Sequence, residues 1–346
     1  MAGDAHREYA DAAGRWFASS AGPARLRRFI DGDPADERAL WDGFSGFGLG
    51  ELIADETDPG ERAQVLAQVA LQAGRFLYAG PLAEAVAQEL LGMPAAPGAL
   101  VLAALPQAGA AVPRWRQHDR TLTGALCAIP YAGAAERWLV AAADTRGSVL
   151  ADTVRAPRTL AIAGTRQADG TANATLEFAA HPADACDAIG SGPPAAAAIA
   201  ELRDLLVMST AARLIGAADE ACVLAREHLL LRTQFGRKLA SFQVLQHQAV
   251  DHYTNLQLAR ALLEQVLAHW QAAATREVAL PALKAFSATA GLAAAKNAVQ
   301  MFGAAGFAHE GDAGLYLRHV MTLACRYGDA PAHRRAFAAV EFDFLE

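Results

Sequence analysis

The sequence predicts an α+β chain of several domains: an N-terminal helical domain, a small middle domain built as a β-sheet or β-barrel, and a C-terminal four-helix bundle. Two changes in the residue pattern indicate this order. Apolar residues recur at helical spacing as far as about residue 93, and short apolar runs bounded by turns fill the stretch from Leu100 to Phe178. Helical spacing then returns and holds to the end. The predicted boundaries are 1–97, 98–188 and 189–346.

The composition indicates a globular protein with a large core. The chain has 346 residues, of which 53% are hydrophobic and 19% charged. A formal net charge of −7 without a basic stripe gives no electrostatic case for nucleic acid. The four cysteines form no C-x-x-C pair, so we expect reduced thiols and no metal site. The first twenty residues lack an apolar signal core, and we expect a cytoplasmic protein without a membrane partner.

The spacing of apolar residues up to residue 93 predicts four or five N-terminal helices with short connections. Leu26, Phe29 and Ile30 share one face of such a helix. Asp33-Pro34 and Asp58-Pro59-Gly60 supply breaks and helix caps.

Five short segments predict strands in the middle domain, separated by turns such as Asp144–Gly147. They are Leu100–Leu105, Thr121–Ile129, Trp138–Ala142, Thr159–Ile162 and Ala174–Phe178. Segments of this length predict one small antiparallel sheet or barrel. The stretch from Pro182 to Pro194 predicts a linker because it is rich in proline and glycine.

The C-terminal part predicts long helices, which in pairs favour a bundle. The expected helices are Ala195–Leu231, Phe242–Ala274, Pro281–Phe302 and Gly314 to the end of the chain. Proline suits the first turn of the third helix, because its missing amide has no partner there.

The segment Arg232–Gly236 interrupts the helical pattern between two of these long helices. Its glycine predicts a helix stop and an immediate restart. Arg232 would lie in the last turn, where its guanidinium can meet a phosphate, and Phe235 would add a flat ring at the same corner. The segment therefore indicates a site for a phosphorylated, planar ligand, although a plain helix hairpin explains the same pattern.

Several motifs in the C-terminal half occur together and in order. They are Arg-x-Gln-Phe-Gly at 232–236, Ser-Phe-Gln-x-x-Gln-His at 241–247, Gln-x-Phe-Gly-x-x-Gly-Phe at 300–307, Tyr-x-Arg at 316–318 and Gly-x-x-x-x-x-Arg at 328–334. In order and spacing, the chain from Ala195 to Val340 resembles the C-terminal half of the acyl-CoA dehydrogenase family. The three-part layout of the whole chain resembles the fold of that family as well.

The resemblance implies a flavoenzyme in which FAD lies across a dimer interface. Arg232 matches the arginine that meets the FAD phosphates, and Phe235 matches the aromatic residue of the same loop. The segment from Gln300 to Ala304 matches the loop that holds the adenosine end of the FAD in the neighbouring subunit. The expected FAD-binding residues are Arg232, Gln234, Phe235, Gln243, Gln300, Gly303 and Ala304.

The sequence departs from the family at the catalytic base. Active members carry a glutamate immediately before the glycine that is Gly328 here, and this chain has Tyr327 instead. A phenol with a pKa near about 10 is a poor general base at neutral pH. Other members place the base on the first long helix of the bundle, near Leu206 here. The catalytic residue therefore stays unknown, with Asp204 and Asp329 as weak candidates beside Tyr327.

The middle domain departs from the family too. The stretch from Leu105 to Ala111 lacks the glutamate and serine that hold the flavin ring, and Trp138 does not match the family's second stretch with confidence. The adenosine half of the FAD site therefore looks kept, and the half for the flavin ring and the acyl-CoA looks eroded. Such a pattern resembles the shorter chain of heteromeric acyl-CoA dehydrogenases in bacterial steroid and side-chain catabolism.

Three functions stay open at this point. The favoured one is a subunit of an FAD-dependent enzyme that desaturates an acyl-CoA at the α,β bond, assembled as a dimer or tetramer with another acyl-CoA dehydrogenase subunit. The resemblance implies an electron-transfer flavoprotein as the electron acceptor. The second is a self-sufficient homo-oligomeric dehydrogenase with a relocated base. The third is a structural paralogue without flavin.

Overall fold

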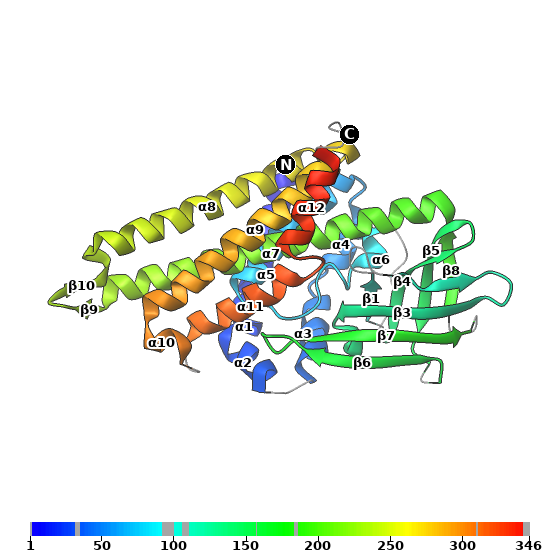
Figure 1. Cartoon of the computed structure of the whole chain (residues 1–346), viewed down its shortest axis with the longest axis horizontal. Coiled ribbons are helices and arrows are strands. Elements are labelled where there is room, and N and C mark those ends of the chain that lie inside the picture. The colour runs from blue at the N-terminus through cyan, green and yellow to red at the C-terminus, as the bar shows by residue number, and fades with distance from the viewer. Residues whose placement is uncertain are drawn as a thin grey trace. The chain divides into compact units, whose positions relative to one another are not determined.

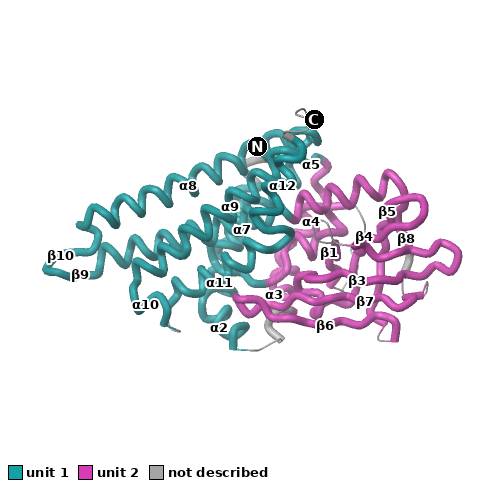
Figure 2. Tube along the Cα trace, viewed as in Figure 1, with its two compact units in different colours: residues 1–32, 58–79, 207–346 teal, residues 33–57, 80–206 magenta. Residues whose placement is uncertain are grey.

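The structure of the chain is a computed structural model, and it describes residues 2–31, 35–91, 100–105, 111–156, 158–182, 186–308 and 311–341. The chain divides into two compact units, which have different colours in Figure 2. Unit 1 contains residues 1–32, 58–79 and 207–346, and unit 2 contains residues 33–57 and 80–206. The limits of three domains at residues 97 and 188 stay predictions.

Unit 1 is built from helices and one small hairpin (Figure 1). Its helices are α1 (Ala2–Ser20), α2 (Pro23–Asp31), α5 (Pro59–Arg75), α7 (Gly192–Leu231), α8 (Gln243–Ala268), α9 (Ala273–Phe302), α10 (Ala304–Phe307), α11 (Asp312–Cys325) and α12 (Ala330–Glu341), with the start of α7 belonging to unit 2. Asp58 caps α5, because its Oδ1 accepts hydrogen bonds from the amides of Gly60 (2.7 Å) and Glu61 (3.2 Å). This confirms the predicted cap at Asp58–Gly60.

Helices α5 and α7 cross at Gly74 and Gly216, which let the two backbones touch. A Cβ atom at Gly74 would clash with the carbonyl group of Arg213, and one at Gly216 would clash with that of Leu71. The Arg213 side chain is buried near this crossing, and its Nη2 donates a hydrogen bond to the carbonyl oxygen of Tyr78 at 2.5 Å. The crossing therefore fixes α7 directly against α5.

Helices α7, α8 and α9 run alongside one another in unit 1 (Figure 1), as expected for a bundle. The predicted start of the third long helix was wrong: α9 begins at Ala273, and Pro281 lies inside it. Proline there removes one backbone hydrogen bond, but Leu280 and Leu283 beside it are buried and hold the helix in the bundle.

Helix α9 is also strongly apolar. Among the described residues it is the one helix long and apolar enough to cross a membrane by length and composition. Of its most apolar window, 56% is buried inside the protein. A helix in the middle of a bundle meets the same criterion, because it is apolar on several sides.

Unit 2 contains the short helices α3 (Ala35–Ser45), α4 (Leu49–Asp55) and α6 (Ala87–Leu90) and an eight-stranded sheet. The strands are β1 (Val101–Ala104), β2 (Arg114–Arg116), β3 (Thr121–Pro130), β4 (Arg137–Asp144), β5 (Gly147–Val154), β6 (Leu160–Arg166), β7 (Ala172–His181) and β8 (Cys186–Ser191). Their order is β6-β7-β3-β2-β4-β5-β8, and β1 pairs with β4 off this path. Both β1 and β2 are parallel to β4, so the expectation of an antiparallel sheet was wrong for these two pairings.

The predicted linker between Pro182 and Pro194 was also wrong. Strand β8 lies inside it and pairs with β5, and α7 already begins at Gly192. Strand β8 forms because β5 offers it a free edge, which local composition does not reveal. The two prolines that follow Gly192 fit the first turn of α7, where no helical partner awaits their missing amides.

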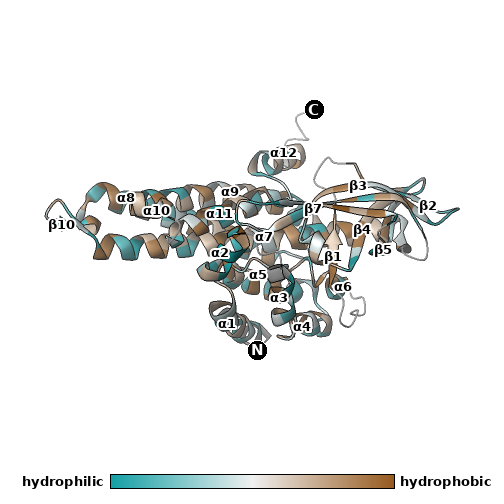
Figure 3. Ribbon diagram, turned by 90° about the horizontal axis from the view of Figure 1, so that it is seen from below, coloured by the Kyte–Doolittle hydropathy of each residue, from teal (hydrophilic) through white to brown (hydrophobic). Residues whose placement is uncertain are grey.

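The core of unit 2 lies on one side of the sheet. Trp138 and Tyr131 are fully buried in it, together with Trp115 and the leucines Leu122 and Leu126 of β3. Hydropathy colouring shows apolar residues along β4 and along the long helices (Figure 3). Helices, then a sheet, then a helical bundle follow one another along the chain, which confirms the predicted α+β class.

We expect Gly216→Ala to lower the free energy of unfolding by about 3 kcal/mol, because the new methyl group would push the α5 and α7 backbones apart. Urea unfolding followed by circular dichroism measures the change. Gly133→Ala is the matched control, since a Cβ atom at Gly133 meets nothing within 4 Å. Equal stabilities of the two variants would contradict a tight crossing.

Candidate functional site

The segment after α7 forms a hairpin and not an immediate second helix. The strands β9 (Thr233–Gln234) and β10 (Arg237–Lys238) pair antiparallel, and a short 3₁₀ turn (Leu239–Ser241) leads into α8. Phe235 and Gly236 form the turn with φ values of +53° and +74°. Two positive φ values suit the tight hairpins that follow the twist of β-strands. The expected immediate helix restart was therefore wrong, although the predicted stop was right.

The hairpin is held to the end of α7 by backbone groups. The Lys238 Nζ donates a hydrogen bond to the carbonyl oxygen of Leu231 at 2.7 Å, which satisfies a free carbonyl of the last helical turn. The Leu239 amide donates to the carbonyl oxygen of Arg232 at 2.9 Å. The hairpin is thus a fixed projection from the bundle.

Phe235 projects from this hairpin with 88% of its surface exposed. A left-handed backbone is uncommon for a bulky residue and costs energy. Among the described residues its ring meets that of Phe242, which lies edge-on with 6.2 Å between centroids and has the Arg237 guanidinium 3.9 Å from its own centroid. Since Phe235 gains little burial within its own chain, its ring is available to another molecule.

The hairpin is also cationic. Arg232 is exposed, and its guanidinium makes no ion pair or hydrogen bond with any residue that the structure describes. Burial and the nearby Arg232 charge lower the pKa of His228, so His228 is neutral near pH 7. A free guanidinium at the rim of the bundle can bind a phosphate with two parallel hydrogen bonds.

A second loop lies at the same end of unit 1, where α9 passes into α10 (Figure 1). Gly303 has a φ of +63°, and its amide donates to the carbonyl oxygen of Gln300 at 3.0 Å. Gln300, Gly303 and Ala304 are all exposed. The rings of His228 and Phe302 stack with centroids 4.3 Å apart, which ties this loop to the end of α7.

The structure thus gathers the predicted FAD-binding residues at one end of unit 1. Arg232, Gln234 and Phe235 share the hairpin, Gln243 begins α8, and the segment from Gln300 to Ala304 forms the second loop. The residues fit an adenine dinucleotide chemically, since a free guanidinium suits a pyrophosphate and an exposed ring suits a flat base. A Cβ atom at Gly303 would meet nothing within 4 Å, so a ligand has room at this loop.

The predicted position of the catalytic base lies in a turn between α11 and α12, so the expected single helix from Gly314 was wrong. Tyr327 has a φ of +56° and Gly328 a φ of +108°. A Cβ atom at Gly328 would lie 2.9 Å from His333 Nε2, so only glycine fits. The His333 Nε2 donates a hydrogen bond to the carbonyl oxygen of Tyr327 at 3.0 Å.

Lys284 of α9 holds the other side of this turn, and sequence reasoning missed it. The side chain is fully buried, and its Nζ donates hydrogen bonds to the carbonyl oxygens of Ala324 (3.0 Å) and Gly328 (2.9 Å). Burial lowers the Lys284 pKa to about 7. Burial and the Lys284 charge lower the pKa of His333 to about 4. A lone lysine between apolar helix residues was the signal that could have found it.

The three candidates for a base lie in different settings. Tyr327 is only 9% exposed. Asp329 is exposed, and its Oδ1 accepts a hydrogen bond from the Ala332 amide at 2.8 Å, which caps α12. Asp204 is half-buried on α7 near the buried Leu206. The assignment of a base to any of them stays a prediction.

His319, His247 and Trp138 supply no further candidate for the catalytic base. His319 is buried in α11, and His247 is exposed on α8. Trp138 is fully buried in the core of unit 2, with the Arg155 guanidinium 5.7 Å from its ring centroid. Most of the stretch from Leu105 to Ala111 lies outside the described residues.

Solved structures identify the class of fold. The chain is similar to the Tcur3481–Tcur3483 steroid ACAD, with a TM-score of 0.86 and 23% identity over 100% of this chain and 99% of that chain. It is also similar to the ChsE4–ChsE5 complex from Mycobacterium tuberculosis, with a TM-score of 0.81 and 18% identity over 98% of each chain. The fold is therefore that of acyl-CoA dehydrogenases.

Sequence comparison gives relatives of the same kind. Residues 207–340 match the model of the acyl-CoA dehydrogenase C-terminal domain. Over 308 residues the chain is 28% identical to acyl-CoA dehydrogenase IpdE2 of Mycobacterium tuberculosis, which covers 87% of this chain and 86% of that protein. Residues 207–340 thus match the C-terminal domain of acyl-CoA dehydrogenases, and the chain as a whole is similar to a member of that family.

Because the pKa of Lys284 is lowered in the folded state, we expect the free energy of unfolding to rise with pH. Its folded pKa of about 7 lies below the usual 10.5, so the unfolded state binds more protons between these values. The free energy of unfolding therefore rises with pH in this window, by at most about 1.4 kcal/mol per pH unit. We expect Lys284→Met to remove this rise, as measured by urea unfolding between about pH 7 and about pH 10.

The matched control is Lys296→Met, which removes an exposed lysine from the same helix. This variant should keep the rise seen in the original chain. If Lys284→Met keeps it as well, a group other than Lys284 causes the pH dependence.

Proposed function

We propose that the chain is a subunit of an FAD-dependent acyl-CoA dehydrogenase and that it grips the pyrophosphate and adenosine of FAD. The observation that carries the proposal is the exposed, left-handed Phe235 beside the unpaired Arg232. A folded chain keeps such a costly arrangement where another molecule covers it. The similarity to acyl-CoA dehydrogenases supports FAD as that molecule.

Each segment has its own part in this proposal. Arg232 binds the pyrophosphate, Phe235 lies against the flat part of the cofactor, and Gln234 and Gln243 add amide hydrogen bonds from the same corner. Gln300, Gly303 and Ala304 take the adenosine of a cofactor held by a neighbouring subunit. The residues of both loops are exposed. We therefore infer that a second chain completes the FAD site.

The proposed reaction removes the α-proton and the β-hydride of an acyl-CoA thioester and leaves an α,β double bond. FAD, when bound, supplies the acceptor of the hydride. The position before Gly328 offers a phenol and no carboxylate, so this chain lacks the usual group for the proton. We therefore assign the base to a carboxylate of a partner subunit, and leave Tyr327, Asp204 and Asp329 as candidates for a self-sufficient enzyme.

Names of similar proteins support the partner and the pathway. The ChsE4–ChsE5 structure is a complex, and the Tcur3481–Tcur3483 structure is described as a steroid ACAD. By analogy we propose a dimer or tetramer with another acyl-CoA dehydrogenase subunit, a substrate from steroid or lipid catabolism, and a cytoplasmic location. An electron-transfer flavoprotein is the proposed electron acceptor.

Absorption spectroscopy tests the subunit proposal. We expect the chain purified alone to be colourless, and the chain co-expressed with a longer acyl-CoA dehydrogenase subunit to carry flavin that bleaches when acyl-CoA is added. Stoichiometric flavin that bleaches in the chain alone would instead establish a self-sufficient homo-oligomer. A colourless co-purified complex would favour a scaffold without flavin.

The Arg232→Ala variant tests the grip on the pyrophosphate. Loss of a charge-assisted contact worth about 1.5–3 kcal/mol should weaken FAD retention by about 10- to 100-fold in the flavin-containing form. Arg232→Lys should recover only part of it, because lysine lacks the planar fork. Arg226→Ala, an exposed arginine on the same helix, is the control. Unchanged retention in Arg232→Ala would place the pyrophosphate elsewhere.

A further inference from the structure

Unit 2 contains a cleft of about 300 Å³ between α3, α4, α6 and β1, and none of its lining residues is assigned to FAD. One part of its wall is apolar and contains the buried Phe44, Leu49 and Val101. The partly buried Trp41 adds an aromatic face. The volume is at the lower end of the range for small-molecule sites, so the cleft suits a compact ligand.

Two neighbouring polar side chains of α6, Gln88 and Glu89, line this cleft. Gln88 is only 6% exposed, and its amide makes no hydrogen bond with a described residue. The Glu89 Oε2 is shielded from solvent and likewise has no hydrogen-bond partner among the described residues. A buried polar atom without a partner costs about 1–3 kcal/mol, and more if it is charged. Glu89 Oε2 is such an atom, and Gln88 beside it adds a second polar side chain to the wall of the cleft.

Among the described residues that line this cleft, carboxylates outnumber positively charged side chains. Glu51 of α4 also lines the cleft. Burial raises the pKa of Glu89, and the Glu51 carboxylate raises it further, because two like charges face one another. A Cβ atom at Gly50 would lie 3.2 Å from Glu89 Oε1, so the backbone of α4 closes over this carboxylate.

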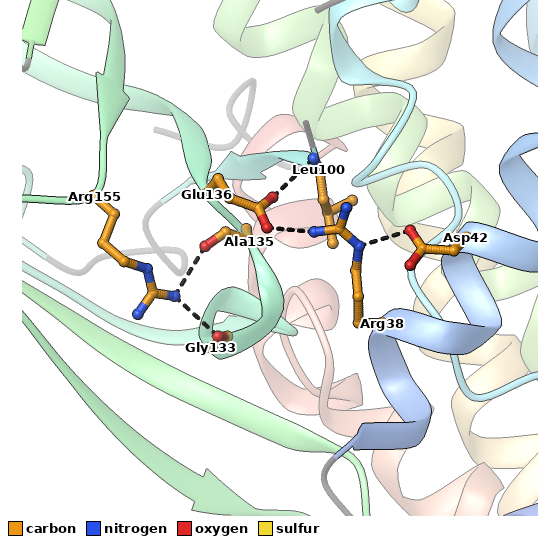
Figure 4. A network of polar contacts seen from close by, with 7 residues as sticks. All are labelled: Arg38, Asp42, Leu100, Gly133, Ala135, Glu136 and Arg155. Carbon is orange, nitrogen blue, oxygen red and sulfur yellow. Dashed lines mark hydrogen bonds and ion pairs between the residues drawn. The ribbon is translucent and has the colours of Figure 1, made fainter. Parts of the chain in front are cut away.

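The one arginine of the wall is already engaged (Figure 4). The Arg38 Nε donates a hydrogen bond to Asp42 Oδ1 at 2.6 Å, and its Nη1 pairs with the Glu136 carboxylate. The other Glu136 oxygen accepts a hydrogen bond from the Leu100 amide at 3.0 Å. Arg38 therefore holds α3 to the start of β4, and its two acceptors among the described residues are Asp42 and Glu136, not Glu51 or Glu89.

We propose that this cleft binds a small organic cation, a primary ammonium group on a short apolar body. The ammonium has three donors, which match the carboxylates of Glu51 and Glu89 and the side-chain carbonyl of Gln88. The apolar body packs against Phe44, Leu49 and the ring of Trp41. Among the described residues no group of three His, Cys, Asp or Glu side chains could hold a metal ion, which favours an organic cation.

Isothermal titration of the full chain with n-butylammonium chloride tests the proposal. We expect a dissociation constant of about 1 mM or tighter. n-Butanol has the same apolar body without the charge and should bind at least about tenfold more weakly, because it leaves the carboxylates unpaired. Absence of butylammonium binding, or equal binding of butanol, would overturn the proposal.

Substitutions separate the charge from the shape of the cleft. Glu89→Gln and Glu51→Gln should each weaken butylammonium binding by about tenfold or more, since each removes one of two carboxylates. Gln88→Leu should weaken it less, because it removes a neutral acceptor. Glu177→Gln, at an exposed position of β7, is the control and should bind as the original chain does. Unchanged affinity in Glu89→Gln would place the ammonium elsewhere and refute the site.

Thermal unfolding gives a second readout that does not depend on titration heats. Without ligand, Glu89→Gln should melt at the same temperature as the original chain or higher, since it removes a partly buried charge that lies near the Glu51 carboxylate. Butylammonium should raise the melting temperature of the original chain and not that of Glu89→Gln. A strongly destabilised Glu89→Gln would mean that the carboxylate has a structural partner, and the proposal would fall. None of these measurements requires FAD or a partner subunit.

Discussion

The close contact between α5 and α7 is the constraint on which unit 1 depends. Gly74 and Gly216 bring two backbones together that are far apart in sequence, and the buried Arg213 is tied to the carbonyl of Tyr78 beside them. The direction of α7 is set there. Since α8 and α9 pack along the same bundle, the hairpin that carries Arg232 owes its place to this crossing.

Much of the fold could be predicted because its long elements have strong local signals. The helix ending at Leu231 lacks internal breaks, and Asp58 is a cap in the sequence as in the structure. Strand β8 and the parallel pairing of β1 could not be predicted, since both depend on an edge supplied by a distant strand. Pro281 misplaced a helix start because burial in a bundle outweighs one missing hydrogen bond.

The candidate site, like the fold, could be predicted only in part. The order of motifs around Arg232 and Gln300 could be recognised without coordinates, whereas the left-handed turn at Phe235 follows from hairpin geometry that the spacing does not contain. Lys284 was missed because its partners are main-chain carbonyls 40 and 44 residues away, and carbonyls leave no trace in a residue pattern. Gln88 and Glu89 could not be singled out from the sequence, because only the structure shows that they line a cleft.

The turn at Tyr327 has one more consequence. Lys284 and His333 hold it through the carbonyl groups of residues 324, 327 and 328, and none of these contacts involves the side chain at 327. These contacts therefore hold the backbone at position 327 without using its side chain. The residue at 327 can change while the turn keeps the lysine and histidine contacts that shape it.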